Sequence, residues 1–480
     1  MSKLAVVGTG YVGLTAGACL AHMGHQVVCV DRDADKVERL AAGDVPIVED
    51  GLSDLVVDGI ASGKLSFTTM LFEAVVGIDQ VLLTLPTPTG SDGSTDLSAL
   101  EAVCGELGPV LASGTVVVVR STVPVGTTRQ VPGMLGRSDL PVVANPEFLR
   151  EGPAVSDFLE PDRIVVGSDD PDASALVVGL YDTLDAPVVE TDPSAAEMIK
   201  YASNAYLVTR LSFINSIAAV CEGLEADVDA VVEGLGLDHR IGPTYLRPGP
   251  GWGGSCFPKD TRSLVDSARR GGYDFLFLEA AIAVNEEQFD RVVAKVAASM
   301  GGSVKGRTVA VWGLPFKART DDHRDSPAVA IVERLLAAGA HVVAHDPTVV
   351  AVTDLLPSDL ELTAGPLEAC SGADALVLLT DWPEFALVDP VAVAEALSTP
   401  SVVDTRGVLD RREWERAGFD VRSIGRWPRG ATRSSTGSPR APLPSVAVCW
   451  STVWRPTRSS RSPPVISGLR PIRRSVFCGR

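Results

Sequence analysis

Two stretches of the sequence hold residue types and spacings that could do chemistry. The first, Gly8-Thr9-Gly10-Tyr11-Val12-Gly13, follows an apolar run, opens a helical pattern, and has Asp31 eighteen residues after its last glycine. This is the dinucleotide fingerprint, whose glycines permit a tight turn, approach of backbone N–H groups to a diphosphate, and close helix–strand packing. Asp31 is expected to accept hydrogen bonds from a ribose and to repel a 2′-phosphate. The pattern predicts NAD as cofactor, although the adjacent Arg32 weakens the preference over NADP.

The second stretch runs from Gly249 to Asp260 and has four glycines in six residues before Cys256. Glycines let a backbone approach a ligand closely. Lys259 follows the cysteine, and a nearby cation lowers a thiol pKa. A cysteine beside a nicotinamide suggests covalent aldehyde chemistry through a thiohemiacetal and a thioester. From these residues alone, an ordinary loop cysteine stays open as the alternative.

Two βαβ patterns must position these residues. Short apolar runs alternating with helical patterns are typical of buried parallel strands. The expected strands are 4–7, 26–30, 80–83, 308–312, 341–344 and 375–379, and the expected helices are 14–23 and 327–338. The fold class is therefore α/β, with two Rossmann-like doubly wound domains. A helix over 193–225, with Ser194 as N-cap and Glu197 in the capping-box position, joins them, and a second helix covers 275–300.

Length, charge and cysteine usage set the class of protein. The 480 residues are 45% hydrophobic and carry a formal charge of −19, which argues against nucleic acid and membrane surfaces as partners. No apolar run reaches the ~18 residues of a membrane span, and the N-terminus enters the glycine turn without a signal peptide, so we expect a cytoplasmic protein. Seven of the eight cysteines are expected to be buried, reduced thiols. The six histidines form no cluster, so no metal is expected.

The charge divides the chain near Gly425. Eleven arginines and no Asp, Glu or Lys follow that residue, so residues 1–425 carry −30. The Arg/Pro/Ser-rich tail is interpreted as a frame-shifted end or as a basic arm for an acidic partner, and in both cases as disordered. The expected domains are 1–192 for NAD, 193–300 as a central helical domain with the cysteine loop, 301–425 as the second Rossmann-like domain, and 426–480 as the tail.

Six linked motifs between about residues 1 and 425 resemble those of the UDP-glucose 6-dehydrogenases, within the UDP-glucose/GDP-mannose dehydrogenase family. They are the glycine turn with the run 252–260, the segment 88–98, Ser121–Thr127, Asn145–Gly152, Lys200–Ala205, and Phe316–Lys317 with Arg324–Pro327. The resemblance implies oxidation of UDP-glucose by two NAD and water to UDP-glucuronate. It also implies a homodimer formed through residues 193–300, a UDP-sugar site in residues 301–425, and Cys256 as the nucleophile.

The same resemblance assigns roles to individual residues. Lys200 and Asn204, four apart on one helix face, stabilise an oxyanion. Asp260, with Lys200 and Thr122, takes the alcohol proton or positions water, and Glu147 is the base for thioester hydrolysis. The cofactor contacts implied are Gly8, Gly10, Tyr11, Val12, Gly13, Asp31, Lys36, Pro86, Thr87, Thr122, Glu151, Lys259 and Arg324. The substrate contacts implied are Phe148, Leu149, Arg150, Glu151, Lys200, Asn204, Arg240, Tyr245, Leu246, Gly253, Phe316, Lys317 and Arg406. Arg240 matches an arginine that reaches the substrate of the neighbouring subunit.

Three alternatives remain from the sequence. The nearest is the same chemistry on GDP-mannose or a UDP-N-acetylhexosamine, although the segment 157–163 and Phe257 look more like the UDP-glucose enzymes. A single-step NAD hydroxyacid dehydrogenase would share the glycine turn without needing Cys256. A non-catalytic sugar-nucleotide binder is the third.

Overall fold

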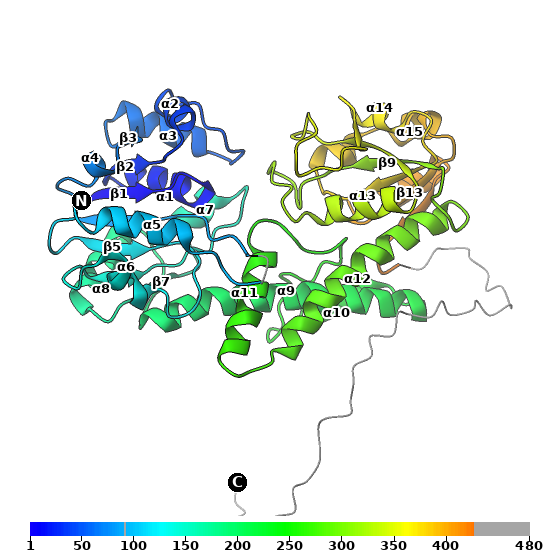
Figure 1. The fold of residues 1–480 in the computed structure, drawn as a ribbon. Coiled ribbons are helices and arrows are strands. Elements are labelled where there is room, and N and C mark those ends of the chain that lie inside the picture. The colour runs from blue at the N-terminus through cyan, green and yellow to red at the C-terminus, as the bar shows by residue number, and fades with distance from the viewer. Residues whose placement is uncertain (91–92, 427–480) are drawn as a thin grey trace, which may run out of the picture. The chain divides into compact units, whose positions relative to one another are not determined.

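Short apolar runs form two separate sheets in the computed structural model, which describes residues 1–90 and 93–426 (Figure 1). Within this part of the chain, the first sheet has the strand order β3-β2-β1-β4-β5-β6-β7-β8, and the second has β11-β10-β9-β12-β13-β14. All neighbouring strands are parallel except β6 and β7. Each order reverses beside its first strand in sequence, as in doubly wound folds. The predicted fold class is confirmed.

The N-terminal sheet is flanked by helices on both faces. Its strands are β1 (Lys3–Val7), β2 (Gln26–Val30), β3 (Leu65–Thr68), β4 (Gln80–Leu83), β5 (Val116–Val119), β6 (Val142–Ala144), β7 (Ile164–Gly167) and β8 (Val188–Thr191). Its helices are α1 (Tyr11–His22), α2 (Ala34–Ala41), α3 (Leu52–Ala61), α4 (Leu71–Ala74), α5 (Ser98–Leu107), η1 (Thr128–Gln130), α6 (Val131–Leu135), α7 (Ala154–Leu159), α8 (Pro171–Val178) and η2 (Gly179–Tyr181). Strands β4 and β5 are buried throughout, as parallel strands covered on both faces must be.

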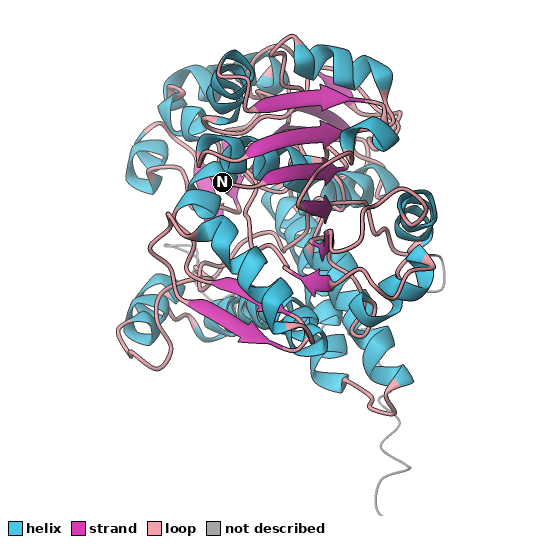
Figure 2. Ribbon diagram, turned by 90° about the vertical axis from the view of Figure 1, so that its left-hand side faces the viewer, coloured by secondary structure: helices cyan, strands magenta, loops and turns pink. Residues whose placement is uncertain are grey.

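The C-terminal sheet repeats the doubly wound plan of the N-terminal sheet, whose strands and neighbouring helices face the viewer in Figure 2. Its strands are β9 (Thr308–Trp312), β10 (His341–His345), β11 (Glu361–Leu362), β12 (Ala375–Leu378), β13 (Ser401–Asp404) and β14 (Asp420–Ser423). Its helices are α13 (Pro327–Ala337), α14 (Pro366–Cys370), η3 (Pro383–Leu387), α15 (Pro390–Ala396) and α16 (Arg411–Arg416). All six predicted strands form, and so do the four predicted helices over 14–23, 193–225, 275–300 and 327–338, because each pattern is local to its element.

Four helices lie between the two sheets in sequence: α9 (Pro193–Leu224), α10 (Val228–Gly236), α11 (Phe257–Arg270) and α12 (Leu276–Ser299). Helix α9 packs against β7, α11 and α12, and α12 packs against α13. In the described residues, α9 is the one helix that is long and apolar enough to cross a membrane, by length and composition only. It is an exception to the expectation that no apolar segment reaches the length of a membrane span. It also carries the buried, ion-paired Lys200, as a core helix between domains does.

The start of α9 differs from the prediction. Asp192 is the N-cap and accepts hydrogen bonds from the backbone N–H groups of Ser194 and Ala195, so Ser194 is already helical. Glu197 turns away from a capping box and accepts hydrogen bonds from Thr128 N (2.7 Å) and Thr128 Oγ1 (2.6 Å). The prediction of Ser194 as N-cap was wrong because both Asp192 and Ser194 can cap and Pro193 fits the first helical position.

Two predictions concern residues that lie wholly or partly outside the described part of the chain. The tail prediction falls on residues 427–480, and Cys449 and Cys478 lie there as well. Among the described cysteines, Cys19, Cys29, Cys104, Cys221 and Cys370 are buried and Cys256 is partly exposed, as predicted. The domain boundaries at 192, 300 and 425 stay predictions.

The close packing of α1 against β1 generates the first test. A Cβ on Gly13 would lie 1.9 Å from Gly8 O, so Gly13→Ala should lower the free energy of unfolding by about 3 kcal/mol or more. Gly105, inside α5, has no atom within 4 Å of such a Cβ, and Gly105→Ala should raise stability by up to about 1 kcal/mol. Urea unfolding of both variants measures the contrast. A stable Gly13→Ala would contradict the packing.

Candidate active site

The glycine turn between β1 and α1 is shaped to receive a diphosphate. Gly8 has φ +99°, and a Cβ there would lie 2.6 Å from Thr84 O, so only glycine fits. A Cβ on Gly10 would meet nothing within 4 Å. Gly10 is the N-cap of α1, and in the described chain no side chain caps this helix. The N–H groups at the start of α1 therefore have no side-chain cap and fit the diphosphate of NAD.

Asp31 follows β2 and is held in place by its neighbours. Its Oδ2 accepts hydrogen bonds from Thr9 N (3.0 Å), Thr9 Oγ1 (2.6 Å) and Lys36 Nζ (3.0 Å). Burial alone would raise the pKa of Asp31, but these hydrogen bonds outweigh burial and keep the pKa below its usual range. The charged carboxylate fits a ribose and opposes a 2′-phosphate. Lys36, predicted as a cofactor contact, also anchors Asp31.

The expected cofactor residues beyond the turn lie at the ends of β4 and β5. Thr87 Oγ1 donates a hydrogen bond to Thr122 O (2.9 Å), which joins the two segments. Pro86 is exposed beside them. The carboxyl ends of parallel strands at a switch point form the ligand crevice of such sheets.

Cys256 is the N-cap of α11 and ends the glycine-rich loop. The loop is held by amide side chains of α9 and α12: Gly249 N donates to Asn215 Oδ1 (2.9 Å) and Trp252 N donates to Asn285 Oδ1 (2.8 Å). Gln288 Nε2 donates to Gly249 O (2.8 Å). The position of the cysteine is thus fixed from two helices.

The glycines of this loop serve packing inside the protein. A Cβ on Gly253 would lie 2.0 Å from Asp325 O, and one on Gly254 would lie 3.0 Å from the Phe316 ring. A Cβ on Gly251 would lie 2.4 Å from the ring of Phe289. These glycines let the loop lie against α12 and the C-terminal domain. The interpretation that they also bring the backbone close to a ligand, including Gly253 as a substrate contact, stays a prediction.

A buried ion pair lies at the centre of the site. Lys200 Nζ donates to Glu147 Oε1 (3.0 Å), and the two residues are 3% and 5% exposed. Burial alone would lower the pKa of Lys200, but Glu147, Cys256 and Asp260 outweigh burial and raise the pKa. Burial alone would raise the pKa of Glu147, but the charge of Lys200 outweighs burial and lowers the pKa. Both groups are therefore charged near neutral pH.

A second buried network lies one turn further along α9. Asn204 Nδ2 donates to Asp260 Oδ2 (2.6 Å), and Lys259 Nζ donates to Asp260 Oδ1 (2.6 Å). Asn204 and Asp260 are 6% and 1% exposed. Lys200 and Asn204 thus face the same side of α9, as their spacing indicates. The amide of Asn204 points at a carboxylate here, and its oxyanion role stays a prediction.

The electrostatics of Cys256 correct one sequence expectation. Burial raises the pKa of the Cys256 thiol to about 11, although Lys200 and, to a lesser extent, Lys259 oppose the rise. Lys259 is paired with Asp260, whose negative charge offsets the effect of Lys259 on the Cys256 thiol. The cysteine is a thiol near neutral pH, and the expected lowering by Lys259 does not dominate.

Glu151 joins the loop before Cys256 to the C-terminal domain. Its Oε1 accepts a hydrogen bond from Ser255 Oγ (2.8 Å) and its Oε2 accepts one from Thr320 Oγ1 (3.0 Å). Arg324 lies 4.0 Å from Glu151 Oε1 and pairs more closely with Asp322. Burial raises the pKa of Glu151 to about 7, and the Asp322 carboxylate adds to the rise. The structure thus brings together the predicted Glu151 and Arg324.

The expected sugar-side residues lie around the same segment. The Phe148 ring is covered by the Arg163 guanidinium (3.7 Å to the centroid), and Lys200 Nζ lies 5.4 Å from that centroid. Arg150 is exposed and pairs with Asp157 (2.6 Å). Leu149 is half-buried, and its backbone N–H donates to Glu147 Oε2 (2.6 Å). These contacts orient the segment that follows β6.

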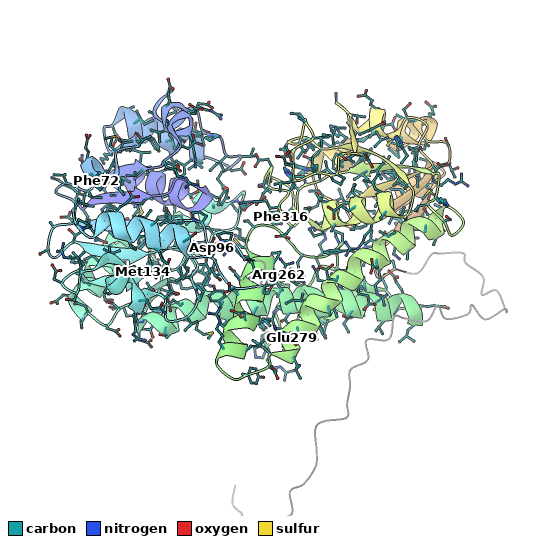
Figure 3. All side chains as sticks on the ribbon, viewed as in Figure 1. Phe72, Asp96, Met134, Arg262, Glu279 and Phe316 are labelled. Atoms are coloured by element: carbon teal, nitrogen blue, oxygen red, sulfur yellow. The ribbon has the colours of Figure 1, made fainter. Side chains whose placement is uncertain are left out.

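Cations from the C-terminal domain reach the same region. Lys317 Nζ donates to Glu151 O, and burial lowers the pKa of Lys317. Arg406 donates to Phe316 O (2.8 Å) and Leu379 O (2.8 Å), and burial lowers its pKa as well. Phe316, labelled in Figure 3, follows β9. Lys317 and Arg406 thus supply cations beside the loop at the sheet end, as a diphosphate requires.

The remaining predicted substrate residues differ in placement. Tyr245 has a positive φ of 57° and is half-buried, and Leu246 is buried. Arg240 lies elsewhere: it is exposed and pairs with Asp238 (2.6 Å). Within one chain, the structure does not bring Arg240 to the Cys256 site.

Comparison with known proteins decides the family. Residues 2–185 match the NAD binding domain of the UDP-glucose/GDP-mannose dehydrogenase family, residues 194–287 its central domain, and residues 310–411 its UDP binding domain. The chain belongs to this family. It is an NAD-dependent dehydrogenase, as predicted from the glycine turn and Asp31.

Relatives of this dehydrogenase family match over nearly the whole chain. The UDP-glucose 6-dehydrogenase TuaD of Bacillus subtilis (strain 168) is 42% identical over 93% of this chain and 98% of its own. The UDP-glucose 6-dehydrogenase of Rhizobium meliloti (strain 1021) is 44% identical over 88% and 99%. The structure of a UDP-glucose dehydrogenase from Pyrobaculum islandicum has a TM-score of 0.80 at 36% identity, covering 89% and 98%.

Several residues that hold this dehydrogenase site together were missed from the sequence. They are Glu49, Ser255, Asp322, Thr320, Asn215, Asn285 and Gln288. Each is a common residue type whose partner lies far away in the chain, as with Glu49 and Gly152. In the described chain, no group of three or more His, Cys, Asp or Glu side chains that could hold a metal ion occurs.

The pKa of Glu151 generates a pH test. Its carboxyl is neutral in the folded protein below about pH 7 and ionises near 4.5 when unfolded. Folding therefore favours proton binding, and this contribution to stability is present below pH 4.5 and lost as the pH rises to about 7. Relative to Glu151→Gln, the wild-type free energy of unfolding should fall over this window and stay level above it. Urea unfolding at several pH values measures this, with the exposed Glu106→Gln as control. A constant difference across the window would contradict it.

Proposed function

We propose that this protein oxidises UDP-glucose to UDP-glucuronate with two NAD, through covalent intermediates on Cys256. The observation that carries the proposal is the buried set of Lys200, Glu147, Asn204 and Asp260 around a single cysteine at the start of α11. A single-step alcohol dehydrogenase does not need a nucleophile, whereas a four-electron oxidation to a carboxylate does.

The first oxidation requires removal of a proton from the 6-hydroxyl. NAD, when bound at the glycine turn, accepts one hydride in each of the two oxidations. Asp260 receives the hydroxyl proton directly or through water, with Lys200 and Thr122 as the hydrogen-bond donors to the substrate oxygen. The raised pKa of Lys200 keeps its ammonium charged, so it stabilises the alkoxide that precedes the aldehyde.

Cys256 then captures the aldehyde. Its sulfur forms a bond to the carbonyl carbon while the thiol proton is released and the carbonyl oxygen gains a proton, which gives a thiohemiacetal. Loss of the hydroxyl proton and of a second hydride gives the thioester. Lys200 and Asn204 stabilise negative charge on this oxygen in each step.

Hydrolysis releases the product and restores the thiol. Glu147 is ionised because Lys200 lowers its pKa, so it takes a proton from the attacking water. The C–S bond breaks, the sulfur takes a proton, and the carboxylate leaves. The high pKa of the Cys256 thiol makes the sulfur a poorer leaving group than an ordinary thiolate, so the departing sulfur needs the proton that it takes.

Substrate binding is assigned to both halves of the chain. We assign NAD to residues 1–192, the reacting sugar to the segment 147–151 and the cysteine loop, and the diphosphate to Lys317 and Arg406 in residues 301–425. The choice of glucose rests on the names of the Bacillus and Rhizobium relatives. At 26% identity, a UDP-D-ManNAc dehydrogenase structure from Pyrococcus horikoshii has a TM-score of 0.79, so the fold alone does not select the sugar.

A substrate panel tests the reaction. With UDP-glucose, the wild-type protein should form two NADH per UDP-glucuronate. The turnover rate of Cys256→Ser should be lower by a factor of at least about 1000, because no thioester forms. UDP-N-acetylhexosamines and GDP-mannose should react at least ten-fold more slowly. NADH formation and product mass spectrometry measure both. One NADH per substrate, undiminished in Cys256→Ser, would refute the covalent route.

We also propose that two copies of the chain form a homodimer along α9. Tyr206, Phe213 and Val220 recur every seven residues on one face and are 60%, 50% and 53% exposed. An apolar stripe at this spacing on a long helix suits a second helix. The exposed Arg240, distant from its own site, fits the expectation that it serves the neighbouring substrate.

The dimer proposal has a matched test. Phe213→Glu should convert the dimer to a monomer and weaken UDP-glucose turnover, because a charge would be buried in the contact. Phe72→Glu, on α4 (Figure 3), has similar exposure (52%) and should change neither property. Sedimentation velocity gives the mass of each. A dimeric Phe213→Glu would contradict the assigned face.

A further inference from the structure

Glu49 is a buried carboxylate that lies between the cofactor turn and the segment carrying the acid–base residues. It precedes α3 and is 8% exposed. Its Oε2 accepts hydrogen bonds from Gly152 N (2.7 Å) and from Tyr11 Oη, and its Oε1 accepts one from Ala154 N (2.6 Å). Burial raises its pKa despite the amide donors, so the protein buries this charge at a cost.

Tyr11 is the partner of Glu49 on the cofactor side. It is the first residue of α1, directly after Gly10, where the diphosphate of NAD fits. Its hydroxyl accepts a hydrogen bond from Gly152 N (2.8 Å) and lies 3.3 Å from Arg150 O. The side chain of a residue in the glycine turn therefore contacts the backbone of the segment 147–154.

This segment carries the groups assigned to the sugar. Glu147 and Glu151 are both buried in it, and Gly152 has a φ of +90°. A shift of the Gly152 and Ala154 amides would therefore move Glu151, which holds Ser255 beside Cys256. The side chain of the exposed Asp50, adjacent to Glu49, makes a surface ion pair with Arg319 (3.4 Å), whereas its contact with the segment is through the backbone, where Asp50 N donates to Gly152 O (3.3 Å).

We infer that Glu49 is a positioning residue that couples the two ligand sites. When NAD orders the glycine turn, the Tyr11–Glu49 contact fixes the segment 147–154, so that NAD and the sugar nucleotide bind cooperatively. Because such coupling is reciprocal, each ligand tightens the other by the same factor. The inference rests on the proposed function for the identity of the sugar nucleotide.

Calorimetry with UDP-glucose, in the absence and presence of saturating NADH, measures the coupling without turnover. NADH should tighten UDP-glucose binding by about five-fold or more in the wild-type protein, within the usual range for allosteric coupling. In Tyr11→Phe and in Glu49→Gln the factor should fall below about two-fold. The coupling factor of the double variant should equal the lower of the two single-variant factors, because both substitutions break the same Tyr11–Glu49 contact. Asp50→Asn, which removes the adjacent exposed carboxylate, should keep the wild-type factor.

Hydrogen exchange provides a readout without any ligand. The Gly152 and Ala154 amides should exchange at least ten-fold faster in Glu49→Gln than in the wild-type protein, while the amides of β4 keep their protection. Tyr11→Phe removes only one hydroxyl, so we expect it to fold. It therefore tests the same contact if Glu49→Gln fails to fold. Wild-type coupling that persists in Tyr11→Phe would overturn this inference alone. Failure of the wild-type protein to bind UDP-glucose would overturn the proposed function and this inference with it.

Discussion

Lys200 and Glu147 form an ion pair from which solvent is almost fully excluded. Taking two charges out of water costs several kcal/mol per ion, and only close, well-directed partners offset that cost. The pair therefore fixes α9 against the segment that follows β6. Because Asn204 lies one turn further along α9, the same constraint places it against Asp260 on α11. The chemistry around Cys256 depends on the register of this one helix.

The cysteine itself is positioned from outside the N-terminal sheet. Amide side chains on α9 and α12 hold its loop, and the glycines of that loop pack against Phe289, Asp325 and Phe316. Glu151 adds hydrogen bonds to Ser255 and Thr320. Residues from three parts of the sequence thus form one site, and a change in any one of them alters the surroundings of the thiol.

The two sheets share a strand order but use their equivalent acids differently. Asp31, after β2, is bound by Thr9 and Lys36 at the edge of the cofactor turn. Asp346, after β10, accepts hydrogen bonds from Leu314 N (3.0 Å) and Trp382 Nε1 (2.9 Å) and is 2% exposed. Its carboxylate is buried and hydrogen-bonded within the protein, so a ribose cannot reach it. One topology therefore supplies an NAD site in the first half and a different ligand surface in the second.

The sequence by itself predicted six of the strands, the long helix and the glycine turn with Asp31, and it singled out Cys256, whose reactivity stays a proposal. Those features depend on residues within about thirty positions of one another, where apolar periodicity and glycine spacing act locally. Only the tertiary structure decided the N-cap of α9, the raised pKa of Cys256 and the roles of Glu49, Ser255 and Asp322. A buried carboxylate such as Glu49 is defined by partners more than one hundred residues away. Burial and distant hydrogen bonds leave no periodic signal in a single sequence, so they emerge only when the chain is folded.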